Sequence, residues 1–538
     1  MEKRTINILS ILYSLFIIIG LSFMVNGDFS LITNSIINIL ISTISFIMLF
    51  FLFKYILILS SKYLDKYKFP DSNPQNKLLI LFDKHPILFS IIVMFICWLP
   101  YIIAYYPGII NKDNVFQIKQ YFGIDNKYSY YVNLIDSTQI ITNHHPYFHT
   151  ILLGTCIKIG KELFSTNFGF FLFTILQAST FIFTLSYSIY YLKKNNINYH
   201  YRLILLMIYS FVPFFPFYAI TLVKDSLYTC YFLLYLIILH STLKEGITIK
   251  KSIQIIIIAV LLFLFRNNGI YTFLLSFPFL LINNKKVGKY LIIILIVFGS
   301  YKTYNNIILP SLKVTPTSIR EALSIPFQQT ARYINYHEKD LSEKDKKIIN
   351  NVLNYKKIKK NYKPELSDPV KNTFNKDSSK KDLKAYLGVW FKGLLKHPVT
   401  YIEATIGNIY GYFCPLKTNW YIYHEYRTEL KEEDNIDYHF NSLETLRLII
   451  SGYGVLFPYI PFIGLLANIG INTWLLLFLI HYLFNKKRFK DIICLAPSLI
   501  TLLVCIASPA NTYFRYVLPI MMSNPFLTLL IITKKEPK

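Results

Sequence analysis

The chain has 538 residues, 54% of them hydrophobic, and a positive mean hydropathy. Apolar runs longer than roughly 18 residues recur along it, which indicates a polytopic membrane protein rather than a series of soluble domains. The formal net charge of +26 could suggest a nucleic-acid partner. The placement of the basic residues argues against that class, because they lie mostly in short loops between apolar runs, where they set membrane topology.

Taken in chain order, the apolar runs predict an all-α transmembrane bundle of about 12 spans. The runs 252–265 and 269–283 are short for a span, so these two segments could tilt or be partly re-entrant. The predicted spans cover residues 6–26, 33–59, 87–106, 168–191, 203–223, 226–243, 252–265, 269–283, 288–308, 463–484, 489–507 and 513–533.

Every second connection between these spans is basic, which places those connections and both termini on the cytoplasmic side of the cell membrane. The loop 105–149 and the region 310–445 then lie outside. An extra span at 147–164 would invert all later loops, so this segment fits better as a helix at the outer interface. Segment 446–465 carries the same ambiguity. The basic residues include Lys62, Lys66, Lys68, Lys193, Lys194, Lys250, Lys251, Lys285, Lys286, Lys486, Lys487, Lys534, Lys535 and Lys538.

This topology divides the chain into three parts. Residues 1–309 form an N-terminal transmembrane bundle with a long external loop at 107–149. Residues 310–445 form an external, mainly helical domain, in which 387–413 is amphipathic and indicates a segment lying along the membrane. Residues 446–538 contain the C-terminal transmembrane helices.

Two polar clusters frame the first external loop. Asp113 and Gln117 share one face of a predicted helix, where the carboxylate could act as a general base or bind a hard cation. His144, His145 and His149 could bind phosphate, relay a proton, or join Asp113 around a metal. Pro146 suits the first position of a helix, with His145 at its cap. The alternative without a function is a helix N-terminus for Asp113, and an interfacial loop rich in amphipathic rings for the histidines.

Charged residues that interrupt later apolar runs are the second set of candidates, because a charge at membrane depth costs a few kcal/mol or more. Lys224 and Asp225 follow the fifth predicted span, and Arg266 separates two short runs. Arg515 and Tyr516 precede the last span. A guanidinium can clamp a phosphate. The alternatives are a self-neutralised turn for the Lys-Asp pair and snorkelling for the arginine.

In the external domain, a helix beginning near Pro326 would place Gln328 and Arg332 on one face, as further substrate-binding candidates. The candidates in the bundle lie in one predicted layer at the outer face. Cations suit a lipid-linked phosphate, and an acid suits activation of an acceptor hydroxyl. A Walker A loop, an H-E-x-x-H zinc motif, a G-x-S-x-G elbow and a Rossmann fingerprint are absent from the sequence.

With these residues in place, the chain resembles the GT-C superfamily of integral-membrane glycosyltransferases. It is similar to a bacterial branch related at a distance to the aminoarabinose transferase and protein mannosyltransferase types. Asp113 opens a long first external loop after a span, and His145-Pro146 closes that loop. Arg515-Tyr516 with Pro519 marks the last external turn, and Asp225 matches a second acidic position in such families.

The resemblance implies an inverting glycosyltransferase that moves a sugar from a polyprenyl-phosphate donor to a cell-envelope acceptor. Asp113 would be the base, and Lys224, Arg266 and Arg515 would bind the phosphate. No cofactor is certain, and a divalent cation stays open. A transporter or flippase of lipid-linked saccharides is the main alternative, but no internal repeat is found. An envelope polysaccharide polymerase or ligase is a further one.

Overall fold

The computed structural model describes residues 2–66, 69, 74–126, 130–138, 140–282, 287–417, 421–426, 430, 436–508 and 510–533. Within these ranges the chain is helical, and its extended contacts are isolated bridges rather than a sheet. The predicted all-α class is therefore confirmed. Six of the lysines used to predict the topology lie outside the described residues: Lys68, Lys285, Lys286, Lys534, Lys535 and Lys538.

Eight described helices are long and apolar enough to cross a membrane, which indicates a membrane protein. A ninth crossing forms if α9 (Tyr199–Phe211) and α10 (Phe214–Ile220) are one span, bent by 56°. The predicted span 203–223 is thus broken, because Pro213 lies at the break and Pro216 follows it. The eight are α1 (Glu2–Val25), α3 (Ile36–Lys66), α5 (Pro86–Ala104), α8 (Thr166–Lys194), α11 (Lys224–Glu245), the segment Val287–Ser311, the segment Phe489–Ile506, and α25 (Phe514–Ile532).

Two of these candidate spans change helix type along their length. The segment Val287–Ser311 contains α14 (Val287–Thr303), the π-helical turn η3 (Tyr304–Ile308) and α15 (Leu309–Ser311). The segment Phe489–Ile506 contains the 3₁₀ turn η10 (Phe489–Leu495) and α24 (Ala496–Ile506).

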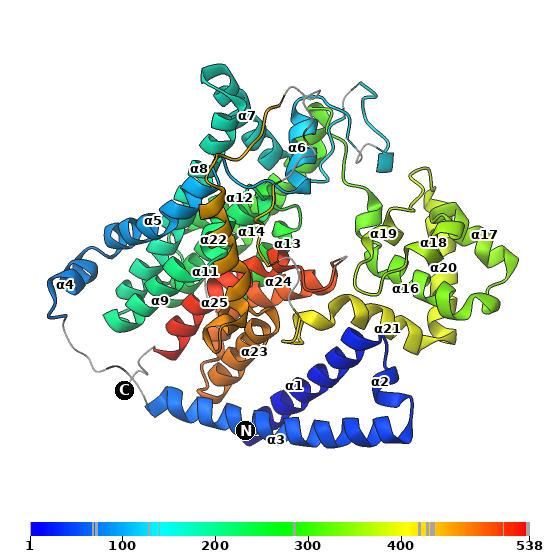
Figure 1. Cartoon of the computed structure of the whole chain (residues 1–538), viewed down its shortest axis with the longest axis horizontal. Coiled ribbons are helices and arrows are strands. Elements are labelled where there is room, and N and C mark those ends of the chain that lie inside the picture. The colour runs from blue at the N-terminus through cyan, green and yellow to red at the C-terminus, as the bar shows by residue number, and fades with distance from the viewer. Residues whose placement is uncertain are drawn as a thin grey trace.

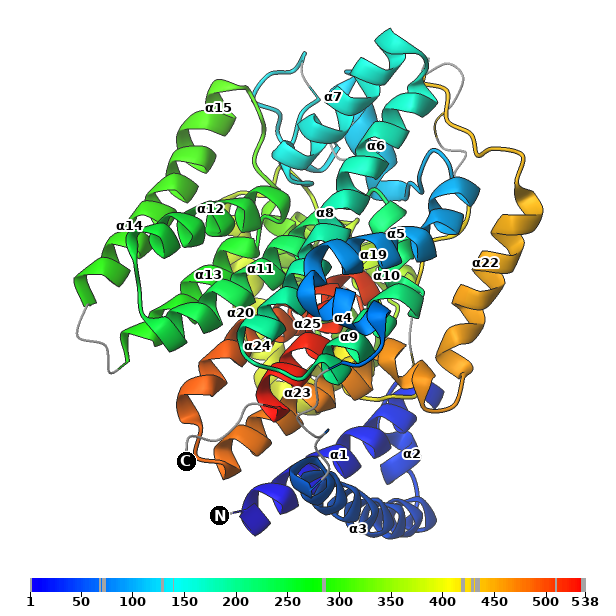
Figure 2. The ribbon, with the colours of Figure 1, turned by 90° about the vertical axis from the view of Figure 1, so that its left-hand side faces the viewer.

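The predicted number of about 12 spans is not confirmed. The other three predicted spans coincide with α12 (Ile249–Phe265), with α13 (Gly269–Ser276) and its extension η2 (Phe277–Leu281), and with α23 (Ile469–Asn485). All three are shorter than the roughly 18 residues that span a bilayer without distortion. Figures 1 and 2 show α9, α11 and α25 together in the bundle, with α1 and α3 as a hairpin at its edge.

The two ambiguous segments are helical but are not among the candidate spans. Helix α7 (Tyr147–Leu163) packs against α8 as a hairpin. Helix α22 (Glu444–Leu456) lies against α5, and the short turns η8 (Phe457–Tyr459) and η9 (Ile463–Ala467) follow it. Figure 2 shows α22 at the edge of the bundle.

The domain predicted at 310–445 has its own hydrophobic core, which includes Phe327, Tyr386 and Tyr401. It lies to one side of the bundle, at the right of Figure 1. The predicted amphipathic segment 387–413 forms most of its last two helices. The domain contains α16 (Ser324–His337), α17 (Glu343–Val352), α18 (Tyr355–Asn361), α19 (Asp368–Lys371), α20 (Lys380–Lys396) and α21 (Pro398–Ile409).

A short extended contact joins the end of α5 to the beginning of α11. The amide of Ile109 donates to the carbonyl of Ile220 at 2.9 Å, and Leu222 N–H donates to the Ile109 carbonyl at 2.9 Å. Gly108 precedes it with φ +123°, and a Cβ there would lie 2.1 Å from Thr174 Oγ1. Only glycine fits this turn. The contact places α6 (Lys112–Tyr121) beside the first turn of α11.

Close packing of α7 on α8 gives a first prediction. A Cβ at Gly160 would lie 2.1 Å from the Cα of Gly169, so Gly160→Ala forces the two helices apart. We expect a loss of roughly 1–3 kcal/mol in the free energy of unfolding, measured by thermal unfolding in detergent. Gly299→Ala in α14 is the matched control, because no atom lies within 4 Å of its added Cβ. Equal melting temperatures for both variants would contradict the packing.

Candidate functional site

A cavity of about 640 Å³ lies where the first long loop, the bundle and the external domain meet. Five segments that are distant in sequence supply the predicted site residues that line it. They are the start of α6, the loop before α7, the start of α11, the α12–α13 turn and the start of α25. Of the predicted site residues, it brings together Asp113, His144, His145, Lys224, Asp225, Arg266, Arg515 and Tyr516.

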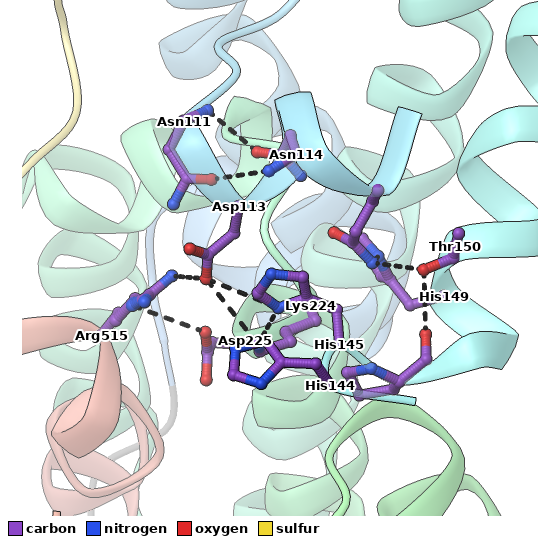
Figure 3. Close-up of polar contacts among 12 residues, drawn as sticks. Asn111, Asp113, Asn114, His144, His145, His149, Thr150, Lys224, Asp225 and Arg515 are labelled. Carbon is purple, nitrogen blue, oxygen red and sulfur yellow. Dashed lines mark hydrogen bonds and ion pairs between the residues drawn. The ribbon is translucent and has the colours of Figure 1, made fainter. Parts of the chain in front are cut away.

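Asp113 is the centre of the charged half of this cavity. Arg515 Nη1 donates to Asp113 Oδ2 at 2.6 Å. The same oxygen lies 3.7 Å from Lys224 Nζ and 3.8 Å from His145 Nδ1. Figure 3 shows these side chains converging from α6, α11, α25 and the loop before α7. Burial by itself would raise the pKa of Asp113, but the charges of Arg515 and Lys224 hold it well below its usual range.

Local sequence explains why Asp113 points into the cavity. Asn111 caps α6: its side-chain oxygen accepts from the backbone N–H of Asn114, and the Asn114 side-chain oxygen accepts from the backbone N–H of Asn111. The Asn114 amide also donates to the carbonyl of Leu222, next to the start of α11. Asp113, in the first turn of α6, is thereby held opposite Lys224.

His145 and Lys224 form the second contact of the site. Lys224 Nζ donates to His145 Nδ1 at 2.8 Å, which assigns the remaining ring hydrogen of neutral His145 to Nε2. Burial, helped by the charge of Lys224, keeps the pKa of His145 well below its usual range. A neutral imidazole can accept this bond, so His145 orients the ammonium group.

Asp225 is completely buried beside the cavity. Arg266 Nε lies 3.6 Å from one of its carboxylate oxygens, and Arg515 Nε lies 4.0 Å from the other. Neither oxygen accepts a hydrogen bond from the described residues. The ring of Tyr516 lies 5.3 Å from the Arg266 guanidinium. Asp225 therefore lies between two guanidinium groups without forming a hydrogen bond to either, while Nη1 of Arg515 is bound to Asp113.

The external domain closes the cavity with charged residues that were not predicted. Glu321 accepts from Lys371 Nζ at 2.6 Å and from Arg320 Nε at 3.1 Å. His144 Nδ1 lies 3.8 Å from Glu321. Burial opposes ionisation of Glu321, yet Lys371 and His144 lower its pKa to about 2. Burial lowers the pKa of His144 to about 4. In sequence these are ordinary charges of a polar region, which carry no signal of burial.

One wall of the cavity is apolar and belongs to α13 and α24. Tyr271 and Leu275 come from α13, and Leu503 comes from α24. Their side chains are 51%, 54% and 61% exposed, although all three lie on apolar helices of a membrane protein. The cavity therefore has a charged half and an apolar half that is open at the surface of the bundle.

Gln117 and His149 do not line the cavity. The Gln117 amide donates to His149 Nδ1 and to Thr150 Oγ1, both at 2.9 Å, and all three side chains are buried between α6 and α7. They position α6. Helix α7 begins at Tyr147, with Pro146 at its cap, so the predicted start is one residue too early.

Gln328 and Arg332 are also remote from the cavity, although they lie on the predicted helix. Gln328 donates to the carbonyl of Lys363 at 2.6 Å. Arg332 donates to Glu403 Oε2 at 2.8 Å and to the carbonyl of Gly27 at 3.1 Å. These bonds attach α16 to its neighbours and to the loop after α1.

The charges of the cavity suit an anionic ligand. Lys224, Arg266 and Arg515 surround two carboxylates, so one further negative charge is needed for balance. Among the described residues, no three His, Cys, Asp or Glu ligand atoms come close enough here to hold one metal ion. A divalent cation at this site stays a prediction from the sequence.

A family model described as "Family of unknown function (DUF6020)" matches residues 4–538. The chain belongs to this family. No curated protein and no solved structure matches the chain.

The low pKa of His144 predicts a pH-dependent stability. Its pKa falls from 6.5 to about 4 on folding, so below about pH 6.5 the unfolded chain takes up a proton that the folded site resists. Each unit by which the pH falls in this window lowers the free energy of unfolding by up to about 1.4 kcal/mol. Between about pH 7 and pH 5, the free energy of unfolding of His144→Gln should fall by up to about 2 kcal/mol less than that of the wild type. Thermal unfolding at the two pH values measures this difference.

The control for this experiment is His439→Gln, because the His439 side chain is 60% exposed. It should keep the pH dependence of the wild type. The same slope in His144→Gln and wild type would contradict a buried, neutral His144.

Proposed function

We propose that this protein is a membrane glycosyltransferase of the GT-C type. It transfers a sugar from a polyprenyl-phosphate donor to a hydroxyl of a cell-envelope acceptor. The cavity lies at the outer face of the cell membrane, the bundle has about 12 spans, and both termini are cytoplasmic.

The observation that carries the proposal is the joining of two unlike surfaces in one cavity. The charged half holds the carboxylates of Asp113 and Asp225 and the cations Lys224, Arg266 and Arg515, a net positive charge that matches a sugar phosphodiester. The apolar half is open along α13 and α24, where a prenyl chain can stay in the bilayer while its phosphate enters. A soluble sugar nucleotide would have no use for this exposed apolar wall.

In the reaction, the acceptor oxygen attacks the anomeric carbon of the sugar from the face opposite the phosphate. The bond between that carbon and the phosphate oxygen breaks, and its electron pair leaves with polyprenyl phosphate. The acceptor proton moves to the Asp113 carboxylate. Lys224, Arg266 and Arg515 stabilise the charge that develops on the leaving phosphate. The configuration at the anomeric carbon is inverted.

The ion pair between Arg515 and Asp113 couples donor binding to base strength. A carboxylate with a low pKa is a weak base. When the donor phosphate accepts hydrogen bonds from Arg515 and Lys224, these cations stabilise Asp113 less, and its pKa rises toward the ordinary range. Asp113 therefore becomes a competent base only in the presence of the donor.

The same residues argue against a transporter. A transporter is expected to hold charged residues near the middle of the membrane. Here the charged cavity lies at one end of α11, α12 and α25, with residues Lys224 and Arg515 in the first turns of their helices. The placement fits chemistry at one face.

Asp113→Asn should lower the rate of sugar transfer by roughly 100-fold or more, because the amide cannot accept the acceptor proton. The assay uses purified protein, polyprenyl-phosphate sugars and a cell-envelope extract. Asp136→Asn is the matched control, since Asp136 lies in the same loop but pairs with Lys313 outside the cavity. Transfer by Asp113→Asn at the wild-type rate would remove Asp113 as base. If the protein, placed in vesicles, moves the lipid-linked sugar across the membrane without transferring it to an acceptor, it is a transporter instead.

Leu503→Gln tests the apolar wall. The substitution removes apolar contact with a prenyl chain, so we expect KM for a long-chain donor to rise roughly tenfold, for about 1.4 kcal/mol of lost contact. A donor with a short, soluble chain should be affected little. The control is Leu295→Gln on α14, because Leu295 is 68% exposed but does not line the cavity. Equal effects on both donors would contradict a lipid path at this wall.

A further inference from the structure

A second group of chemically distinctive side chains lies in the external domain, away from the cavity. It contains His337, Asp340 and His397. One ligand atom from each of these residues lies within 4.8 Å of the others. Two imidazoles and a carboxylate at this spacing are the ligand set of a transition-metal site.

Two chain segments bring this group together. His337 is the last residue of α16, and the 3₁₀ turn η5 (Glu338–Asp340) follows at once, so Asp340 lies one tight turn further on. His397 is the single residue between α20 and α21. Its amide donates to the carbonyl of Gly393, and Pro398 begins the next helix, which fixes the backbone at His397.

The two imidazole rings stack face to face. Their centroids are 3.7 Å apart and their planes differ by 16°. The ring of Tyr333 lies beside both imidazoles, with its centroid 5.8 Å from that of His337 and 5.7 Å from that of His397. The stack brings imidazoles from two segments of the domain together. Because an imidazole nitrogen binds a metal in the plane of its ring, the two rings must turn from the stack so that their nitrogens, ~3.4 Å apart around a tetrahedral ion with bonds of roughly 2.0–2.1 Å, point at the same ion.

The surrounding hydrogen bonds orient the three ligands. His397 Nε2 lies 2.7 Å from Asp340 Oδ2, and His337 Nε2 lies 2.9 Å from Thr400 Oγ1. Lys396 Nζ lies 3.1 Å from the other oxygen of Asp340, but the Lys396 side chain is 52% exposed. An ion can replace the hydrogen between His397 and Asp340, while Lys396 is free to turn into solvent.

We propose that His337, Asp340 and His397 bind a divalent transition-metal ion such as Zn²⁺. Two imidazole ligands favour such an ion over Mg²⁺ and Ca²⁺, which prefer oxygen. Three protein ligands leave a position for water. This site is separate from the cavity and does not depend on the proposed glycosyltransferase activity.

A metal here would fasten the end of α16 to the junction of α20 and α21. The other end of α16 follows the turn η4 (Ile319–Glu321), which carries Arg320 and Glu321 over the cavity. The ion would therefore brace the domain that closes the cavity, and it would raise the thermal stability of the folded protein by binding it preferentially.

The test uses the full-length protein in detergent, stripped of metal with a chelator and titrated with Zn²⁺ by calorimetry. We expect one Zn²⁺ per chain and a higher melting temperature. His337→Gln and His397→Gln should each weaken binding by at least about tenfold. The control is His439→Gln. His439 also pairs with an aspartate, Asp437, at 3.1 Å, but among the described residues this pair has no third ligand close enough to form a metal site.

A second readout separates lost binding from lost folding. Co²⁺ bound by nitrogen and oxygen ligands absorbs visible light, and this absorption should disappear in His337→Gln and stay in His439→Gln. Asp340→Asn, at an exposed position, should fold normally and bind Zn²⁺ more weakly. Wild-type protein that binds no Zn²⁺, or binds it as tightly after His337→Gln or Asp340→Asn, would overturn the site.

Discussion

The ion pair between Asp113 and Arg515 is the contact on which the rest of the site depends. It joins α6 to α25 across 402 positions of sequence, and both side chains are largely buried. Breaking a buried pair leaves an uncompensated charge and costs several kcal/mol. The bundle around it must therefore hold the two helices at a fixed separation. The extended contact at Ile109 and the cap of α6 serve that purpose on the side of Asp113.

Much of the charged half of the site could be predicted from the sequence, for a physical reason. A bilayer penalises charge, so Lys224, Arg266 and Arg515 are conspicuous among apolar residues. The alternation of basic and non-basic loops predicted that they lie in one layer, and the cavity does bring them together with Asp113 and His145. The apolar background made these polar residues informative.

The same reasoning has little power in the polar domain. Arg320, Glu321 and Lys371 close the cavity, but charges are common in such a region and their burial depends on tertiary packing. Gln328 and Arg332 drew attention because polar and aromatic residues are dense around them. That density does indicate burial. Their hydrogen-bond partners are Glu403 and backbone carbonyls, which a single sequence does not show.

The wide sequence separation of Asp113 and Arg515 also sets an order of assembly during synthesis. At roughly 5–20 residues per second, about 20–80 s pass between the two residues leaving the ribosome. Lys224, made much earlier, lies 3.7 Å from the same carboxylate oxygen. It can serve as a provisional counter-ion while α25 is still missing. The nascent bundle is thus spared an isolated charge, yet its charged cavity is incomplete until its last described helix has inserted.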